Sequence, residues 1–426
     1  MTLDNFFCTA EVSGNGWPWS TEARETDWNE KNIAMDYAFD VTRYNAPYDA
    51  EGQNRNVTLY SSLASREAEN PGYAAATSGL PGGSANVLSG TNDDGAADGP
   101  NGQVQGGYIW DAALKKGLRI RDYGFLSDNS LYSGPNAVPE STNPLAPFET
   151  KTQVFAPANQ TLAKPGNFDP YFRGFDNTYP DLYRFEEFKR EFQQFDAKNN
   201  LPSLVMLRYM HDHMGSFSSA NKFLPNTGNP EFQQGDNDAA VGMTLQLVAH
   251  SANYARNTLF IIVEDDAQDG PDHEDAHRST AYVVGPYVKQ HAVVSTRYST
   301  VNAVRTIEDV LGLEHLNLYT AYQRPMTDVF DIGATGFWDY TPIISTYVKQ
   351  ANLNLASLMD DGTVQYAEGP AKPTHDAAWW TAQTKGYDWS SEDRIPTALF
   401  NQVVWRGMKG NVPFPVTRSA KVTRQY

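Results

Sequence analysis

The stretch TLFIIVEDDAQDGPDHEDAH (residues 258–277) joins a short apolar run to a dense group of acidic and imidazole side chains. Seven carboxylates and two imidazoles lie in this stretch, all of them after Val263. Carboxylates packed this closely repel one another unless a positive charge lies among them. The simplest candidate for that charge is a bound metal ion.

The apolar run Thr258–Val263 predicts a buried strand of a parallel sheet, because it is short, continuous and rich in β-branched residues. In open α/β sheets, ligands bind beyond the carboxyl ends of the strands. Glu264, Asp265 and Asp266 follow the run directly and would stand at that edge. The alternative is a solvated acidic loop, although such loops rarely follow a buried strand and rarely carry two histidines four residues apart.

A second polar group follows another predicted strand. Leu204–Tyr209 is mostly apolar and leads into Met210-His211-Asp212-His213. An Asp oxygen beside a His nitrogen suits zinc, manganese or iron better than calcium. A hydrogen-bonded loop explains one His-Asp-His group equally well, but two such groups at two strand ends favour a metal site. We expect His211 to pack beside that site.

The order of the predicted elements indicates an α/β fold with a mostly parallel central sheet and helices on both faces. A predicted helix at Asp238–Ala255, capped by Asp236 or Asp238, connects the two strands as in a βαβ unit. Both polar groups would then lie at one edge of the sheet. Further helices are predicted at Tyr108–Lys116, Pro180–Asn199 and Ser299–Leu311, and further strands at Leu118–Leu126, Ala281–Val284 and Ala292–Thr296. In the second of these helices, a stripe of Phe185, Phe188, Phe192 and Phe195 would face the core.

We expect one domain over residues 1–426, interrupted by two irregular insertions. Residues 70–107 are rich in Gly, Ala, Ser, Asn and Asp, and residues 127–178 contain many Pro and Asn. Such composition is typical of loops and surface excursions.

These segments together resemble the phosphoesterase branch of the alkaline-phosphatase superfamily, which includes phospholipase C-like and acid phosphatase-like enzymes. The resemblance is strongest in Asp212-His213, residues 264–278, Gly285-Pro286-Tyr287, residues 295–299 and Arg305-Thr306-Ile307-Glu308. Weaker likeness at Leu3–Phe7, Glu11–Gly16 and Phe400–Trp405 extends it over nearly the whole chain.

The resemblance implies an alkaline-phosphatase-like fold and a phosphate ester, either a small molecule or a phospholipid head group, bound across one or two divalent metals (Zn, Mn, Fe or Ca). It implies that an enzyme nucleophile attacks phosphorus and that water hydrolyses the phospho-enzyme. Carried over to this chain, it assigns the metal ligands to Asp212, Asp265, Asp266 and His277, and the catalytic histidines to His213 and His273.

The chain departs from the family pattern near its N-terminus. Members usually begin with a strand ending in a Glu-Asn-Arg-Thr-like turn that supplies a metal ligand, and this sequence starts after that point. Pro18 stands near the expected nucleophile position, with Ser13, Ser20 and Thr21 nearby. We therefore expect a domain without its first strand, which a missing N-terminal segment or upstream domain would complete. We expect the chain alone to hydrolyse a phosphate ester very weakly or not at all. The alternative is a non-catalytic metal-binding relative that uses the same sheet edge for a ligand or partner.

Composition narrows the range of partners. The formal charge of −18 disfavours nucleic acid, whose backbone would be repelled. No apolar run approaches the ~20 residues of a transmembrane helix. Cys8 is the only cysteine, so no intrachain disulfide can form. The resemblance implies an exported protein, although the opening residues 1–4 do not have the pattern of a signal peptide.

Overall fold

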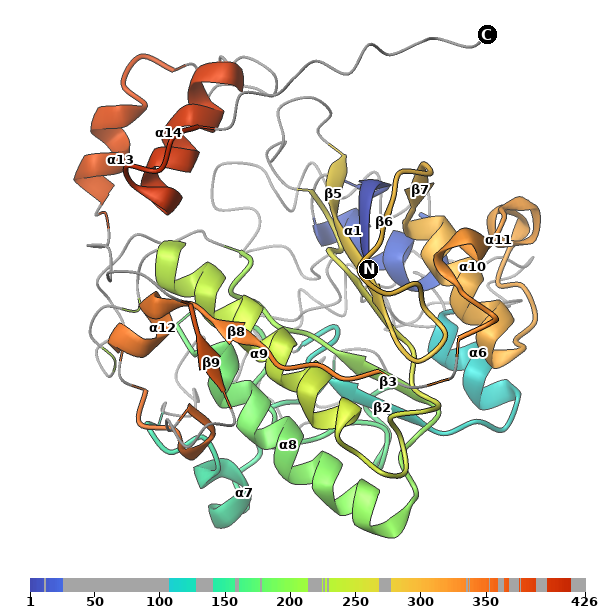
Figure 1. Cartoon of the computed structure of the whole chain (residues 1–426). Helices are drawn as coiled ribbons and strands as arrows, with labels where there is room; N and C mark the ends of the chain where they lie inside the picture. The colour runs from blue at the N-terminus through green and yellow to red at the C-terminus, as the bar shows by residue number, and fades with distance from the viewer. Residues whose placement is uncertain are drawn as a thin grey trace, which may run out of the picture.

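The structure is a mixed α/β arrangement in which helices surround a central group of strands (Figure 1). It is a computed structural model. It describes residues 1–10, 13–25, 107–127, 141–157, 161–176, 178–213, 224, 227, 230–267, 277–334, 336, 338–351, 353–358, 364–367, 375, 377–387 and 397–414.

The largest sheet has five strands, with β1 (Thr2–Phe7) at its centre. On one side β1 pairs antiparallel with β5 (Arg278–Val284), which pairs antiparallel with β4 (Phe260–Val263). On the other side β1 pairs parallel with two short strands, β6 (Val293–Val294) and β7 (Tyr298–Ser299). Phe6, opposite Ser279 and Tyr298 in this register, is fully buried in the core beneath the sheet.

The prediction of a mostly parallel sheet is wrong for this part of the chain, because β4 and β1 both run antiparallel to β5. The apolar run of β4 indicates a strand but carries no information on the direction of its partner. A clearer signal lies in β5, where exposed Thr280 and Tyr282 alternate with fully buried Ala281 and Val283. That alternation is typical of antiparallel sheets with one solvated face.

A second sheet pairs β2 (Ile120–Tyr123) with β3 (Leu204–Leu207) in parallel, with Ile120 opposite Leu204. The side chains of β3 alternate between two cores, as the pleat of a strand requires. Leu204 and Met206 pack with helices α1 (Ser13–Glu22), α6 (Ile109–Lys115) and α10 (Thr300–Leu311). Val205 and Leu207 pack with α8 (Asp181–Lys198) and α9 (Pro230–Ala249). Helices therefore cover both faces of this sheet.

The expected βαβ unit is only partly present. Helix α9 does connect β3 to β4, but the two strands belong to different hydrogen-bonded sheets. They are joined instead through a shared core, in which Val205 and Leu207 of β3 pack with Phe260 and Ile262 of β4. The two strands thus contribute to one hydrophobic layer without pairing directly.

Most predicted helices are confirmed, with shifted boundaries. Phe185, Phe188 and Phe192 of α8 are buried as the stripe predicts, while Phe195 is half-buried. Helix α10 ends at Gly312, whose φ of 62° lies in the left-handed region that favours glycine. Helix α9 begins at Pro230, earlier than predicted. The prediction missed its first two turns because they are polar and lack apolar periodicity. Asp236 and Asp238 therefore lie inside the helix, and the prediction that one of them caps it is wrong.

The remaining elements lie around this framework. They are α7 (Ala146–Thr150), α11 (Leu318–Tyr322), η3 (Thr327–Val329), β8 (Ile343–Ile344), α12 (Thr346–Ala351), η4 (Ala356–Leu358), β9 (Gln365–Tyr366), α13 (Ala377–Gln383) and α14 (Thr397–Lys409). Of the predicted insertions, 70–106 lies outside the described residues, and the described parts of 127–178 contain only α7 as regular structure.

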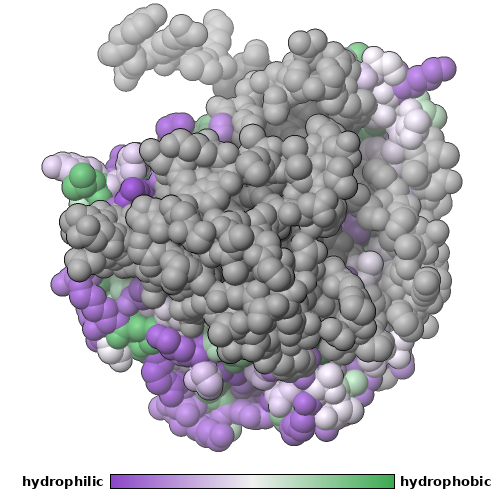
Figure 2. Space-filling model, turned by 180° about the vertical axis from the view of Figure 1, so that it is seen from behind, coloured by the Kyte–Doolittle hydropathy of each residue, from purple (hydrophilic) through white to green (hydrophobic). Residues whose placement is uncertain are grey.

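On the face seen in Figure 2, hydrophilic side chains of described residues gather along the lower margin, with hydrophobic ones scattered among them. None of the described helices combines the length and the apolar character needed to cross a membrane.

Candidate functional site

The acidic segment that follows β4 lies directly against helix α1. A Cβ atom built on Gly16 would lie 2.5 Å from the carbonyl oxygen of Asp265 and 3.2 Å from Cβ of Asp266. The hydroxyl of Ser13 donates a hydrogen bond of 2.7 Å to Oδ2 of Asp266. The backbone N–H of Ala267 donates to the carbonyl of Ala10 at 3.2 Å. Close approach of the two backbones is possible only because residue 16 has no side chain.

Cys8, directly after β1, forms hydrogen bonds to residues at both ends of the acidic segment. The Cys8 N–H donates to the carbonyl of His277 at 2.7 Å, and its thiol donates to the carbonyl of Glu264 at 3.3 Å. Burial raises the pKa of the Cys8 thiol, and the charges of Glu264 and Asp265 raise it further. Cys8 therefore remains a neutral thiol and acts as a hydrogen-bonding tether.

Asp212 lies close to the same group, although it comes from the other predicted cluster. Burial raises its pKa to about 7, and the charges of Asp265 and Glu264 add to the shift, while Arg208 acts in the opposite direction. An interaction of this kind requires short separations in a poorly solvated region. Asp212, after β3, thus lies within electrostatic range of Asp265 and Glu264, after β4.

The other predicted site residues differ in their surroundings. His213 follows Asp212 and is exposed, with its ring 5.8 Å from that of Phe175 in an edge-on contact. His277 stands immediately before β5 and is half-buried. His273 lies outside the described residues. Asp212 is therefore within electrostatic range of Asp265, and Asp266 and His277 adjoin the same acidic segment. The roles of these four residues and of His213 stay predictions.

Three hydroxyls were candidates for a nucleophile, and the structure separates them. Ser20 and Thr21 both donate to the carbonyl of Trp17 within their own helix, at 3.2 and 2.5 Å. Ser13, at the start of α1, is the one of the three whose hydroxyl donates to a predicted metal ligand. Pro18 lies inside α1 and is buried. The position of Ser13 makes it the hydroxyl best placed for chemistry at the acidic group.

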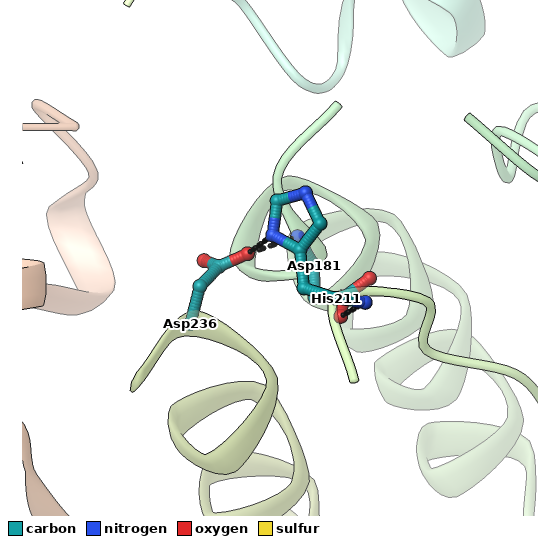
Figure 3. Close-up of side chains that lie close together, drawn as sticks. All are labelled: Asp181, His211 and Asp236. Carbon is teal, nitrogen blue, oxygen red and sulfur yellow. Dashed lines mark hydrogen bonds and ion pairs between the residues drawn. The ribbon is translucent and has the colours of Figure 1, made fainter. Parts of the chain in front are cut away.

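A second group, buried between α8 and α9, consists of Asp181, His211 and Asp236 (Figure 3). One ligand atom from each lies within 4.8 Å of the others, and this spacing could hold a metal ion. Sequence reasoning missed the group because its members come from the start of α8, the loop after β3 and the interior of α9. The only signal was His211, which was expected to pack beside a site.

Hydrogen bonds already use most of the oxygens in this group. Oδ2 of Asp236 accepts from the Asp181 N–H and from Nδ1 of His211, both at 2.6 Å. Oδ1 of Asp236 accepts from the Leu182 N–H at 3.3 Å, so this carboxylate caps α8 rather than its own helix. Asp181 in turn accepts from the backbone N–H groups of Met210 and His211 and from Arg184.

The charge balance of the group suits an internal network. Burial alone would lower the pKa of His211, but the hydrogen bond and charge of Asp236 outweigh it, so the pKa is raised above its ordinary value. The His211 ring pairs with the buried carboxylate of Asp236, and the Arg184 guanidinium pairs with that of Asp181. The network joins α8, α9 and the loop that carries Asp212 and His213, so it fixes the position of that loop.

Comparison with known proteins adds no assignment, since no protein family and no curated protein matches the chain.

We expect Gly16→Ala to lower the free energy of unfolding by roughly 1–3 kcal/mol, because the new methyl group would collide with the Asp265 carbonyl. At an unconstrained helix position the same change would stabilise by roughly 1 kcal/mol, so the sign of the effect is informative. Urea unfolding of the variant, with Ser20→Ala on the same helix as the control, measures it. Equal stability of Gly16→Ala and the unaltered chain would contradict the close packing of α1 on the acidic segment.

A second prediction concerns the buried network. Asp181→Asn should lower the free energy of unfolding by about 3–5 kcal/mol, because it leaves the buried Arg184 guanidinium without its carboxylate partner. Asp339→Asn, which alters an ion pair whose acidic side chain is 66% exposed, should change it by less than about 1 kcal/mol. Metal content should be the same in both variants, and a selective loss of metal from Asp181→Asn would show that this group holds an ion.

Proposed function

We propose that the chain is a metal-dependent hydrolase of phosphate esters, with its site at Asp212, Asp265, Asp266 and His277. The observation that carries the proposal is the convergence of acidic groups from two polar segments, close enough that their charges help raise the pKa of Asp212 to about 7. The resemblance of these segments to the phosphoesterase branch of the alkaline-phosphatase superfamily supplies the reaction class. The hydroxyl of Ser13 beside Asp266 supplies a group able to attack phosphorus.

The donor types of these four residues suit a divalent metal. Three carboxylates repel one another in a half-buried region, and a cation among them would remove that repulsion. Carboxylate oxygens with one imidazole nitrogen suit Zn, Mn or Fe, and oxygen alone would suit Ca. Asp212, Asp265, Asp266 and His277 are the residues that would hold the ion. When bound, it would act as a Lewis acid toward the phosphoryl group.

Ser13, Asp266 and His213 would then carry out nucleophilic attack and proton transfer. Asp266 accepts the Ser13 hydrogen bond, so it can orient the hydroxyl and take its proton. In the proposed reaction, Oγ of Ser13 forms a bond to phosphorus, the ester P–O bond breaks, and the leaving oxygen takes a proton from His213. Water then attacks phosphorus and gives a proton to His213, the P–Oγ bond breaks, and Oγ takes back the proton from Asp266, which restores the hydroxyl.

Metal binding is the first test. Purified chain equilibrated with Mn²⁺ or Zn²⁺ and then desalted should retain metal, whereas Asp265→Asn/Asp266→Asn should retain little, since each substitution removes one anionic ligand. The control, Asp331→Asn/Asp339→Asn, removes the same charge from exposed positions and should behave like the unaltered chain. Elemental analysis measures the difference. Equal and negligible metal in all three proteins would rule out the site.

Turnover is the second test. With Mn²⁺, Zn²⁺ or Ca²⁺ supplied, we expect at most weak metal-dependent hydrolysis of an aryl phosphate by the chain alone, and Ser13→Ala should abolish it without loss of metal. Ser20→Ala and Thr21→Ala serve as controls, because their hydroxyls bond within the helix. A phosphomonoester, a phosphodiester and a phosphocholine ester compared side by side define the substrate class. Turnover that survives Ser13→Ala would exclude Ser13 as the nucleophile, and metal binding without turnover on any ester would favour the non-catalytic relative.

A further inference from the structure

Arg208 is held between two aromatic rings at the end of β3. Its guanidinium carbon lies 4.4 Å from the ring centroid of Trp17 and 4.9 Å from that of Phe175. Its backbone N–H donates to the Tyr123 carbonyl at 3.0 Å, which extends the pairing of β2 and β3 by one step. Backbone and side chain are both fixed by these contacts. Cation–π contacts of this kind use the charge of the guanidinium and do not satisfy its N–H donors.

The N–H edge of Arg208 is not fully used within the described part of the protein. Nη1 is buried and makes no hydrogen bond to a described residue. Arg208 as a whole is half-buried, whereas the buried Arg121 donates to Glu191 and the buried Arg184 donates to Asp181. A guanidinium carries five N–H donors and is rarely buried without acceptors. A ligand oxygen could supply the hydrogen-bond acceptor that Nη1 of Arg208 lacks.

The two rings connect Arg208 to both halves of the acidic site. Trp17 follows Gly16, which packs on the backbone of Asp265. Phe175 also makes the edge-on contact with His213. Arg208 itself lies four residues before Asp212 and is near enough to act on its pKa. A ligand at the acidic site would therefore reach the region of the clamped guanidinium.

We propose that Arg208 is an anion-binding residue that donates from Nη1 to an oxygen of a tetrahedral phosphoryl group, as found in inorganic phosphate and in phosphate monoesters. This inference rests on the proposed function for the class of ligand. The guanidinium fork matches the spacing of phosphoryl oxygens, and a clamped fork loses little conformational entropy on binding. The alternative is that Arg208 only neutralises Asp122 and Asp212, whose pKa values it lowers. That role does not explain why Nη1 is buried without a hydrogen bond, and neither acid forms an ion pair with Arg208 among the described residues.

Titration calorimetry with inorganic phosphate tests the proposal, with Mn²⁺ present and again in metal-free protein. Arg208→Met should weaken phosphate binding roughly 10- to 100-fold, the range expected for losing a hydrogen bond to a charged group. Arg256→Met, which removes the same charge from an exposed position, should leave it unchanged. Arg208→Lys should recover only part of the affinity, because lysine lacks the planar fork. Equal affinities of Arg208→Met and Arg256→Met, or no phosphate binding by the unaltered chain, would overturn the proposal.

A second measurement needs no variant and covers the case in which Arg208→Met does not fold. Phenylglyoxal modifies accessible arginines, and peptide mapping of the unaltered chain reports the extent at each one. Phosphate should slow modification of Arg208 and leave that of Arg256 unchanged; equal rates at Arg208 with and without phosphate would refute the role. Phosphate binding that depends on Arg208 in a protein without metal or turnover would support this inference while contradicting the proposed hydrolase.

Discussion

The buried carboxylates of Asp236 and Asp181 hold the parts of this fold together. Asp236 accepts the first N–H groups of α8, which a helix leaves without partners, and Asp181 accepts the N–H groups of the loop after β3. Two helices and one loop are thereby fixed by side chains rather than by regular pairing. Because the loop continues into Asp212 and His213, the geometry of the candidate site depends on this network, which lies one layer beneath it.

Charge is distributed in opposite ways in the two groups. In the buried network, each carboxylate faces a cation, His211 or Arg184, and the hydrogen bonds are short. Around Asp212, carboxylates face one another, and Arg208 is the positive group that acts on its pKa. The first arrangement is complete as it stands, whereas the second gains from added positive charge. This contrast is the physical reason for placing the proposed metal in the second group.

Sequence reasoning identified the main strands and helices and the approach of the two polar segments. It could not determine strand direction, because the apolar run of β4 is the same in a parallel or an antiparallel pair. It placed Asp236 as a cap of α9, since helix capping is local in sequence, whereas this residue caps a different helix from within its own. Arg208 carried no signal, because a clamp by Trp17 and Phe175 joins three distant segments.

The tether at Cys8 has a consequence for any ligand that binds the acidic segment. Cys8, the residue directly after β1, bonds to the carbonyls of both Glu264 and His277, so the two ends of the intervening segment are brought together when the sheet forms. The loop-closure entropy of that segment is then lost during folding, before any ligand arrives. Asp265 and His277 start from a closed loop, and association of a cation with them would carry a correspondingly smaller entropic penalty than capture by an open chain.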